Sequence, residues 1–178
     1  MPAKKLLLLF INISGGIAVL GSYAQGVLTH PGAGQILWGG LPLGIRPFYT
    51  ASMFLAAAGY FAFTYLILFR LHSNDTLVAN RFGFGVFNLL YAAILIPSAL
   101  WMPFTFLAVE GSSQALLWVV RMVLAAVAAA SLGLLFALTK VNPRPTRWAY
   151  RMAIVGSLFF CFQTVVLDAI LWVLFFRL

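Results

Sequence analysis

The sequence predicts an all-α protein, an integral membrane bundle of five transmembrane helices. Two observations support this prediction. Of the 178 residues 63% are hydrophobic and only 8% are charged, and the apolar residues gather in five runs of about 20 residues or more. So few charges cannot cover the surface of a domain folded in water, so the lipid bilayer is the expected environment. The runs are continuous rather than alternating, which favours helices over the strands of a membrane barrel.

The five expected spans form a single domain that covers residues 1–178. A helix rises about 1.5 Å per residue, so about 20 residues cross a hydrocarbon layer that is about 30 Å thick. The segments of sufficient length are residues 5–27, 48–70, 83–108, 114–138 and 148–176. The third and fifth segments are long enough to tilt or to extend past the interface.

Lysine and arginine residues predict the orientation, because they are retained on the cytoplasmic side of short loops. Eight of the eleven flank one side of the expected bundle: Lys4, Lys5, Arg70, Arg81, Lys140, Arg144, Arg147 and Arg151. Arg46 and Arg177 flank the other side. We therefore expect a multi-pass protein with a cytoplasmic N terminus and a C terminus on the opposite side. The net charge of +8 then reflects topology, and no nucleic-acid partner is expected.

The longest connection, residues 28–47, differs from the others in composition. It is rich in glycine and proline, which disfavour a regular helix, and it contains Trp38, which favours a membrane interface. Long loops of this kind are often functional, so we expect this one to form a lid over the outer mouth of the bundle. The alternative is a connector that lies on the lipid headgroups.

Polar and small residues inside the spans recur at helical spacing, which predicts the face of each helix that avoids lipid. In the last span this stripe is Ser157, Cys161, Thr164, Asp168 and Trp172. In the second span the stripe is Tyr49, Ser52, Ala56, Tyr60 and Thr64. In the third span it is Asn88, Tyr91, Ser98 and Thr105. In the fourth span it is Gln114, Trp118, Arg121, Ala125 and Ala128. We expect these stripes to meet in one interior. A ladder of Ala125, Ala129 and Gly133 also predicts a close helix contact.

Arg121 and Asp168 are expected to form an ion pair. Each lies about two turns from the outer end of its span, so both occupy the outer third of the membrane. An ionisable side chain at this depth costs roughly 2.5–3.5 kcal/mol on insertion scales and is usually paired or functional. The alternatives are a pair that only fixes the packing of the fourth and fifth spans, and an Arg121 that extends alone to the headgroups.

Several other side chains are expected near the interior. Asn88, Tyr91 and Gln163 are interpreted as structural polar residues that bond across helices. Near the outer boundary lie the aromatic residues Tyr23, Trp38, Tyr49, Trp101, Trp118 and Trp172. An interfacial aromatic belt would explain them, but their common depth also allows an aromatic-walled pocket beneath residues 28–47.

No enzyme motif is found. The sequence has no paired carboxylates, no His/Asp/Glu metal cluster, no Ser-His-Asp set and no glycine-rich phosphate loop between a strand and a helix. Cys161 is the single cysteine, so neither an intramolecular disulfide nor a cysteine-rich metal site is expected. We therefore expect a protein that is not an enzyme, with no catalytic residues and no metal.

The first long loop and the second span carry a family resemblance. The loop contains Trp38 and Leu41-Pro42, and the second span opens with Pro47-Phe48-Tyr49-Thr50. Later spans contain Asn88-Leu89-Leu90-Tyr91 and Leu167-Asp168. This arrangement resembles the tryptophan-rich sensory protein / translocator protein (TspO/MBR) family of five-helix proteins. The sequence departs from that family in having Pro47 where two prolines are usual, Tyr91 in place of Trp and Asp168 in place of an amide. The resemblance implies a cavity closed by the first loop, planar hydrophobic ligands such as tetrapyrroles or sterols, and a homodimer.

Three functions are compatible with these features. The first is binding or carriage of a hydrophobic, tetrapyrrole- or sterol-like molecule in an outer-leaflet pocket under residues 28–47. The expected ligand-binding residues are Trp38, Arg46, Tyr49, Trp101, Trp118, Arg121, Asp168 and Trp172. A planar ligand with one acidic group would suit this set, because Arg46 or Arg121 could receive the acid. The second function is a small structural subunit of a larger membrane complex, and the third is a protomer of a dimeric transporter.

Overall fold

The computed structural model describes residues 2–144 and 147–178, and it confirms the all-α class. Five helical stretches in this part of the chain are long and apolar enough to cross a membrane: Ala3–Thr29, Leu43–Arg70, Gly85–Glu110, Gln114–Thr139 and Arg147–Phe175. They match the five predicted spans in order, with ends that differ by a few residues. The membrane class of the protein therefore follows from both sequence and structure.

Three of these stretches are single helices: α1 (Ala3–Thr29), α4 (Gly85–Glu110) and α5 (Gln114–Thr139). The second begins with the short 3₁₀ turn η1 (Leu43–Ile45), continues as α3 (Arg46–Tyr65) and ends in the wider π-helical turn η2 (Leu66–Arg70). The last consists of α6 (Arg147–Cys161), the π-helical segment η3 (Phe162–Trp172) and α7 (Val173–Phe175). Wide π-helical segments often occur at functional sites, which draws attention to η3.

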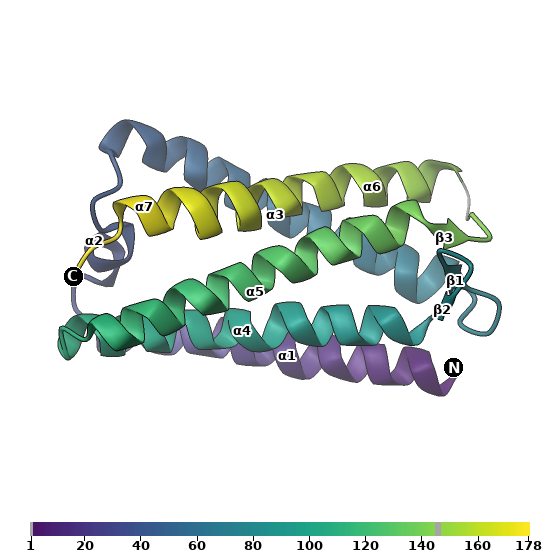
Figure 1. Ribbon diagram of the computed structural model, residues 1–178, viewed down its shortest axis with the longest axis horizontal. Coiled ribbons are helices and arrows are strands. Elements are labelled where there is room, and N and C mark those ends of the chain that lie inside the picture. The colour runs from purple at the N-terminus through teal and green to yellow at the C-terminus, as the bar shows by residue number, and fades with distance from the viewer. Residues whose placement is uncertain (1, 145–146) are drawn as a thin grey trace.

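Two groups of short elements mark opposite ends of the bundle (Figure 1). A three-stranded antiparallel sheet of order β2-β1-β3, formed by β1 (Leu77–Val78), β2 (Phe82–Gly83) and β3 (Val141–Asn142), lies near the N terminus. The helix α2 (Ala33–Trp38) lies near the C terminus. We call these two ends the N-end and the C-end.

The loop of residues 28–47 is more regular than its composition suggested, because it contains the helix α2. Glycines with positive φ bound this helix, Gly32 at +80° and Gly39 at +49°, and L-residues rarely adopt such angles. Gly39 also packs against Phe176, where a Cβ would come within 2.7 Å of the ring. The glycines therefore start and stop a helix here instead of preventing one.

The long helices form two groups (Figure 1): α1 and α4 lie on one side, α3 and α6 lie on the other, and α5 lies between them. α1 packs mainly on α4, whereas α3 packs mainly on α6. The α3–α6 contact is very close, since a Cβ on Gly59 would lie 2.2 Å from the carbonyl oxygen of Gly156. α1 and α3 barely touch each other.

The inward face expected for the fourth span was wrong. On α5 the buried side chains include Leu117, Val120 and Leu124, whereas Gln114, Trp118 and Ala125 are exposed. The polar stripe predicted to face inward therefore lies largely on the outside. Ala125 and Ala129 of the small-residue ladder are also exposed, and only Gly133 packs closely, against Leu90 of α4. Apolar residues fill both faces of this helix, so the few polar ones were a poor guide to its orientation.

Candidate ligand-binding cavity

A cavity of about 790 Å³ lies between the two groups of helices. Side chains from α1, α2, α3, η2, α4, α5, α6 and η3 line it, and they are mostly apolar or aromatic. On α1 the lining runs from Leu9 to Tyr23, which is about 21 Å of helix at about 1.5 Å per residue. The cavity therefore extends much deeper along the bundle than the pocket beneath residues 28–47 that the sequence suggested.

The cavity opens sideways between α1 and α3. Its exposed hydrophobic lining residues belong to these two helices, Ile13 and Leu20 on α1, and Met53 and Phe61 on α3. The exposed fractions of Leu20 and Phe61 reach 70% and 72%. Since both helices are membrane-spanning segments, this mouth faces the hydrocarbon of the bilayer.

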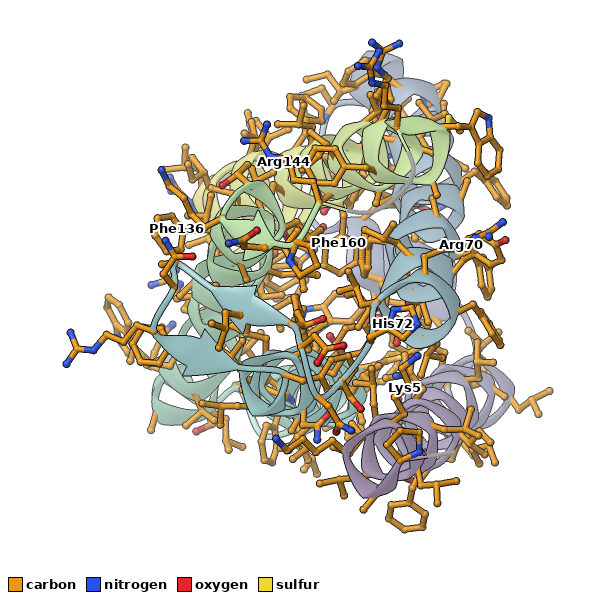
Figure 2. The ribbon with its side chains drawn as sticks, turned by 90° about the vertical axis from the view of Figure 1, so that its right-hand side faces the viewer. Lys5, Arg70, His72, Phe136, Arg144 and Phe160 are labelled. Atoms are coloured by element: carbon orange, nitrogen blue, oxygen red, sulfur yellow. The ribbon has the colours of Figure 1, made fainter. Side chains whose placement is uncertain are left out.

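Two hydrogen bonds cross the gap between α1 and the α3–η2 helix. Tyr60 donates its hydroxyl to Asn12 Oδ1 at 2.7 Å, and Lys5 Nζ donates to the carbonyl oxygen of Leu68 at 2.7 Å. Figure 2, which views the bundle from the N-end, shows Lys5 between these two helices. These bonds link the two walls of the mouth at the N-end and partway along its length.

Aromatic rings form the wall of the cavity at the C-end. Trp38 packs edge-on against Tyr49 with ring centroids 5.5 Å apart, and Trp101 does the same against Trp172 at 5.8 Å. Tyr23 meets Trp101 at 5.9 Å. All five residues line the cavity. Trp172 Nε1 donates to the carbonyl oxygen of Leu37 at 2.8 Å, which fixes α2 against η3 as the cover of this end.

Asp168 provides the acidic group of the cavity. Tyr49 donates its hydroxyl to Asp168 Oδ1, and Gln163 Nε2 donates to the same oxygen at 2.8 Å. Both bonds reach Oδ1, so Oδ2 has no hydrogen-bond partner among residues 2–144 and 147–178. Burial of a carboxyl group in apolar surroundings is costly unless donors are supplied, and the two bonds offset only part of this cost.

Two further polar atoms in the lining have no hydrogen-bond partner in the described part of the chain. They are the donor Trp101 Nε1 and the acceptor Gln163 Oε1, and both are buried. Most buried polar atoms in proteins are hydrogen-bonded, so each exception calls for an explanation.

Five of the eight predicted ligand-binding residues line the cavity: Trp38, Tyr49, Trp101, Asp168 and Trp172. Arg46 lies just outside, with its guanidinium carbon 5.7 Å from the Trp38 ring centroid and its Nε bonded to the carbonyl oxygen of Leu41. Trp118 and Arg121 are not part of the lining. Trp118 is 60% exposed on the outer surface of α5.

The predicted ion pair between Arg121 and Asp168 is wrong. Within residues 2–144 and 147–178, the one contact at salt-bridge distance joins His30 and Glu110, at 3.0 Å. Arg121 instead places its guanidinium carbon 4.6 Å from the centroid of the Trp118 ring, a cation–π contact. Its side chain is half-buried on α5, and its buried Nε has no hydrogen-bond partner among the described residues.

The three residues predicted to be structural take different positions. Asn88 Nδ2 donates to the carbonyl oxygen of Lys4 at 3.2 Å, and Tyr91 shares a hydrogen bond of 2.7 Å with Thr64. These two bonds join α4 to α1 and to α3. Gln163 lines the cavity and contacts Asp168, so it belongs to the site itself.

Sequence reasoning left Asn12 and Tyr23 of α1, and Tyr60 of α3, out of the proposed binding residues, although all three line the cavity. Asn12 could have been found, because it is the one amide within the first half of an otherwise apolar span. An amide in hydrocarbon requires a partner, which here is Tyr60.

The described residues of the site are mostly apolar or aromatic. Among them no group of three His, Cys, Asp or Glu side chains could hold a metal ion. Fold and site together define a helical membrane protein with a cavity open toward lipid. Comparisons with models of protein families, with curated proteins and with solved structures give no match to this chain.

Proposed function

We propose that this protein binds a hydrophobic small molecule that it takes up from the bilayer. The observation that carries the proposal is the apolar cavity of about 790 Å³ with its mouth between α1 and α3. Pockets of about 300–1,000 Å³ suit drug-sized ligands, and a sterol- or tetrapyrrole-sized molecule falls in this class. The proposal agrees with what the resemblance to the TspO/MBR family implies.

The helix α2 supports the proposal as the cover of the C-end. Trp38 of this helix packs on Tyr49, and the Trp172 indole holds Leu37. A ligand in the cavity would therefore touch Trp38 and Trp101 while α2 shields it from water. Indole rings in contact with a ligand also provide a direct spectroscopic readout.

Tryptophan fluorescence tests this function. The protein in lipid nanodiscs is titrated with protoporphyrin dimethyl ester, an uncharged porphyrin that accepts energy from tryptophan, and with an unlabelled sterol as competitor. Gly16 and Gly21 offer a matched pair on α1, because a side chain added at either finds open space, yet only Gly16 lines the cavity. We expect Gly16→Phe to weaken binding about tenfold by filling the cavity, and Gly21→Phe to leave it unchanged.

The Trp38→Ala variant is expected to reduce quenching as well, because it removes a ring from the lining. Absence of saturable quenching in the unmodified protein would contradict the proposal and would favour the structural subunit of a larger complex. If Gly16→Phe and Gly21→Phe weaken binding equally, the substitutions disturb α1 as a whole and the result says nothing about the cavity.

We also propose that the N-end is cytoplasmic. The basic residues Lys4, Lys5, Arg70, Arg81 and Lys140 lie in elements or connections at this end. Gly83 at the N-end and Gly44 at the C-end both tolerate an added side chain, and the native Cys161 is buried. A membrane-impermeant maleimide applied to intact cells should label Gly44→Cys and not Gly83→Cys. The reverse pattern would invert the orientation.

A further inference from the structure

The polar groups of the cavity restrict the chemistry of the ligand. Asp168 is the one carboxyl group in the lining, and none of the described lining residues is lysine, arginine or histidine. Charged groups inside a membrane protein are usually paired with an opposite charge. Tyr49 and Gln163 hydrogen-bond Asp168 but bring no positive charge. The cavity therefore contains a carboxyl group without a cationic partner.

Hydrogen-bond acceptors are also in excess close to Asp168. Its Oδ2 has no partner among the described residues, and Gln163 Oε1 is an unpartnered acceptor on a side chain that is only 6% exposed. The two side chains touch, since Gln163 Nε2 lies 2.8 Å from Asp168 Oδ1. A hydroxyl has one proton to donate, whereas a primary ammonium has three. An ammonium bound to Oδ2 therefore still has protons to donate to a second acceptor such as Gln163 Oε1.

The aromatic residues add a second, independent preference for a cation. Trp38, Tyr49, Trp101 and Trp172 line the same part of the cavity, and Asp168 is one helical turn from Trp172 on η3. Ring faces attract cations, and the attraction is largest where water is excluded. The combination of several rings with one carboxyl group is the type of site that binds organic ammonium ions.

An acidic ligand, which the sequence suggested, fits these groups poorly. That idea required Arg46 or Arg121 in the pocket, and neither lines it. Arg46 is engaged with Leu41 and Trp38, and Arg121 contacts the ring of Trp118. A ligand carboxylate would instead meet Asp168, a group of like charge.

We propose that the ligand is a lipophilic amine whose ammonium group binds Asp168 and Gln163 while its apolar body occupies the aromatic end of the cavity. This inference rests on the proposed binding function and specifies its ligand class. The lateral mouth suits such a molecule, because amines with an apolar body partition into bilayers and can reach the cavity from there.

Three anthracene derivatives with nearly identical bodies test the inference: 9-(aminomethyl)anthracene, 9-anthracenemethanol and 9-anthracenecarboxylic acid. Each is titrated at neutral pH against the protein in phosphatidylcholine nanodiscs, and energy transfer from tryptophan reports binding. Empty nanodiscs correct for partition into lipid. We expect the amine to bind about tenfold more tightly than the alcohol, and the acid to bind most weakly.

Asp168→Asn should remove the preference for the amine, so that the amine and the alcohol bind with similar affinity. Asp75→Asn is the matched control, because it removes the same charge from the polar connection after η2 and should leave the preference intact. If Asp168→Asn does not fold, the order of the three affinities in the unmodified protein decides whether the inference holds. An amine that binds no better than the alcohol, or a preference that survives Asp168→Asn in a folded protein, would overturn the inference.

The same experiment separates this inference from the proposed function. If all three compounds bind equally and Gly16→Phe weakens each of them, the cavity binds hydrophobic molecules without recognising an amine. If none of the compounds gives saturable energy transfer, the binding function itself fails along with the inference.

Discussion

The two faces of α3 show opposite ways of placing one helix beside another. Toward α6, the backbones meet at Gly59 and Gly156 with no room for a Cβ. Toward α1, the same helix presents Tyr49, Tyr60 and Thr64 to a cavity and makes almost no direct helix contact. The glycine pair makes a tight seam, and the bulky polar residues on the other face hold open a space. The site therefore depends on a close contact that lies outside it.

α1 stays in place because another helix holds it. A Cβ on Gly15 would lie 2.8 Å from Leu95, and one on Gly26 would lie 2.5 Å from Met102, so α1 lies close along α4 at two levels. α4 in turn packs on α5. The walls of the cavity thus belong to two separately packed groups, α1 with α4 and α3 with α6. Substitutions at the tight glycine contacts and substitutions at the contacts across the gap should therefore lower the unfolding free energy by different amounts.

The largest effect is expected at the seam. Gly59→Ala places a Cβ against the backbone of Gly156, which cannot move aside without separating α3 from α6. We expect a loss of about 3 kcal/mol in unfolding free energy. Gly21→Ala is the control, since it adds the same methyl in open space on α1 and gains helix propensity. Thermal unfolding in detergent measures both, and equal midpoints would show that the seam is not tight.

A smaller loss is expected at the polar centre of the cavity. Tyr49→Phe removes one of the two hydrogen bonds that Asp168 Oδ1 accepts. Hydrogen bonds to charged groups contribute about 1.5–3 kcal/mol, so we expect a decrease in unfolding free energy of about 2 kcal/mol. Unfolding by denaturant, followed by tryptophan fluorescence, gives the value. An unchanged stability would mean that Asp168 does not depend on Tyr49.

The hydrogen bond across the mouth of the cavity should contribute less to the unfolding free energy than the bond between Tyr49 and Asp168. Tyr60→Phe removes the bond to Asn12, and we expect a loss of about 1 kcal/mol, the usual net contribution of one hydrogen bond. The control is Tyr65→Phe, which removes a hydroxyl that only an exposed Arg70 contacts. Looser attachment of α1 should also speed hydrogen exchange of its backbone amides near Asn12. Faster exchange in both variants would argue against a specific role of Tyr60.

The smallest effect is expected at Arg121. Because this residue contacts Trp118 and does not pair with Asp168, Arg121→Gln should change stability by less than about 1 kcal/mol. Breaking a buried ion pair would cost about 3–5 kcal/mol, which is a clear difference. The same denaturant unfolding assay distinguishes the two values. A loss near the larger figure would restore the ion pair that the sequence suggested.

The last and the fourth predicted spans show how well the spacing of polar residues predicts which face of a helix lies inward. In the last span Ser157, Cys161, Thr164 and Trp172 are buried, and Asp168 lines the cavity, as their spacing predicted. In the fourth span the same reasoning placed Trp118 and Arg121 inside, and both lie outside the cavity. The first stripe combines Ser157, Cys161, Thr164 and Asp168 with one Trp, whereas the second combines a Gln, an interfacial Trp, an Arg and two alanines that lipid also tolerates.

The sequence by itself determined the five helical spans, their order and the inward faces of α3 and η3, because hydrocarbon thickness and helical period act on each segment alone. Only the tertiary structure decided the partner of Asp168, the sideways mouth and the depth of the cavity. These features depend on the rotation and spacing of helices that are distant in sequence. The separation of α1 from α3 accompanies the close packing of α3 on α6 at Gly59 and Gly156 and of α1 on α4 at Gly26, where the absence of a side chain matters most.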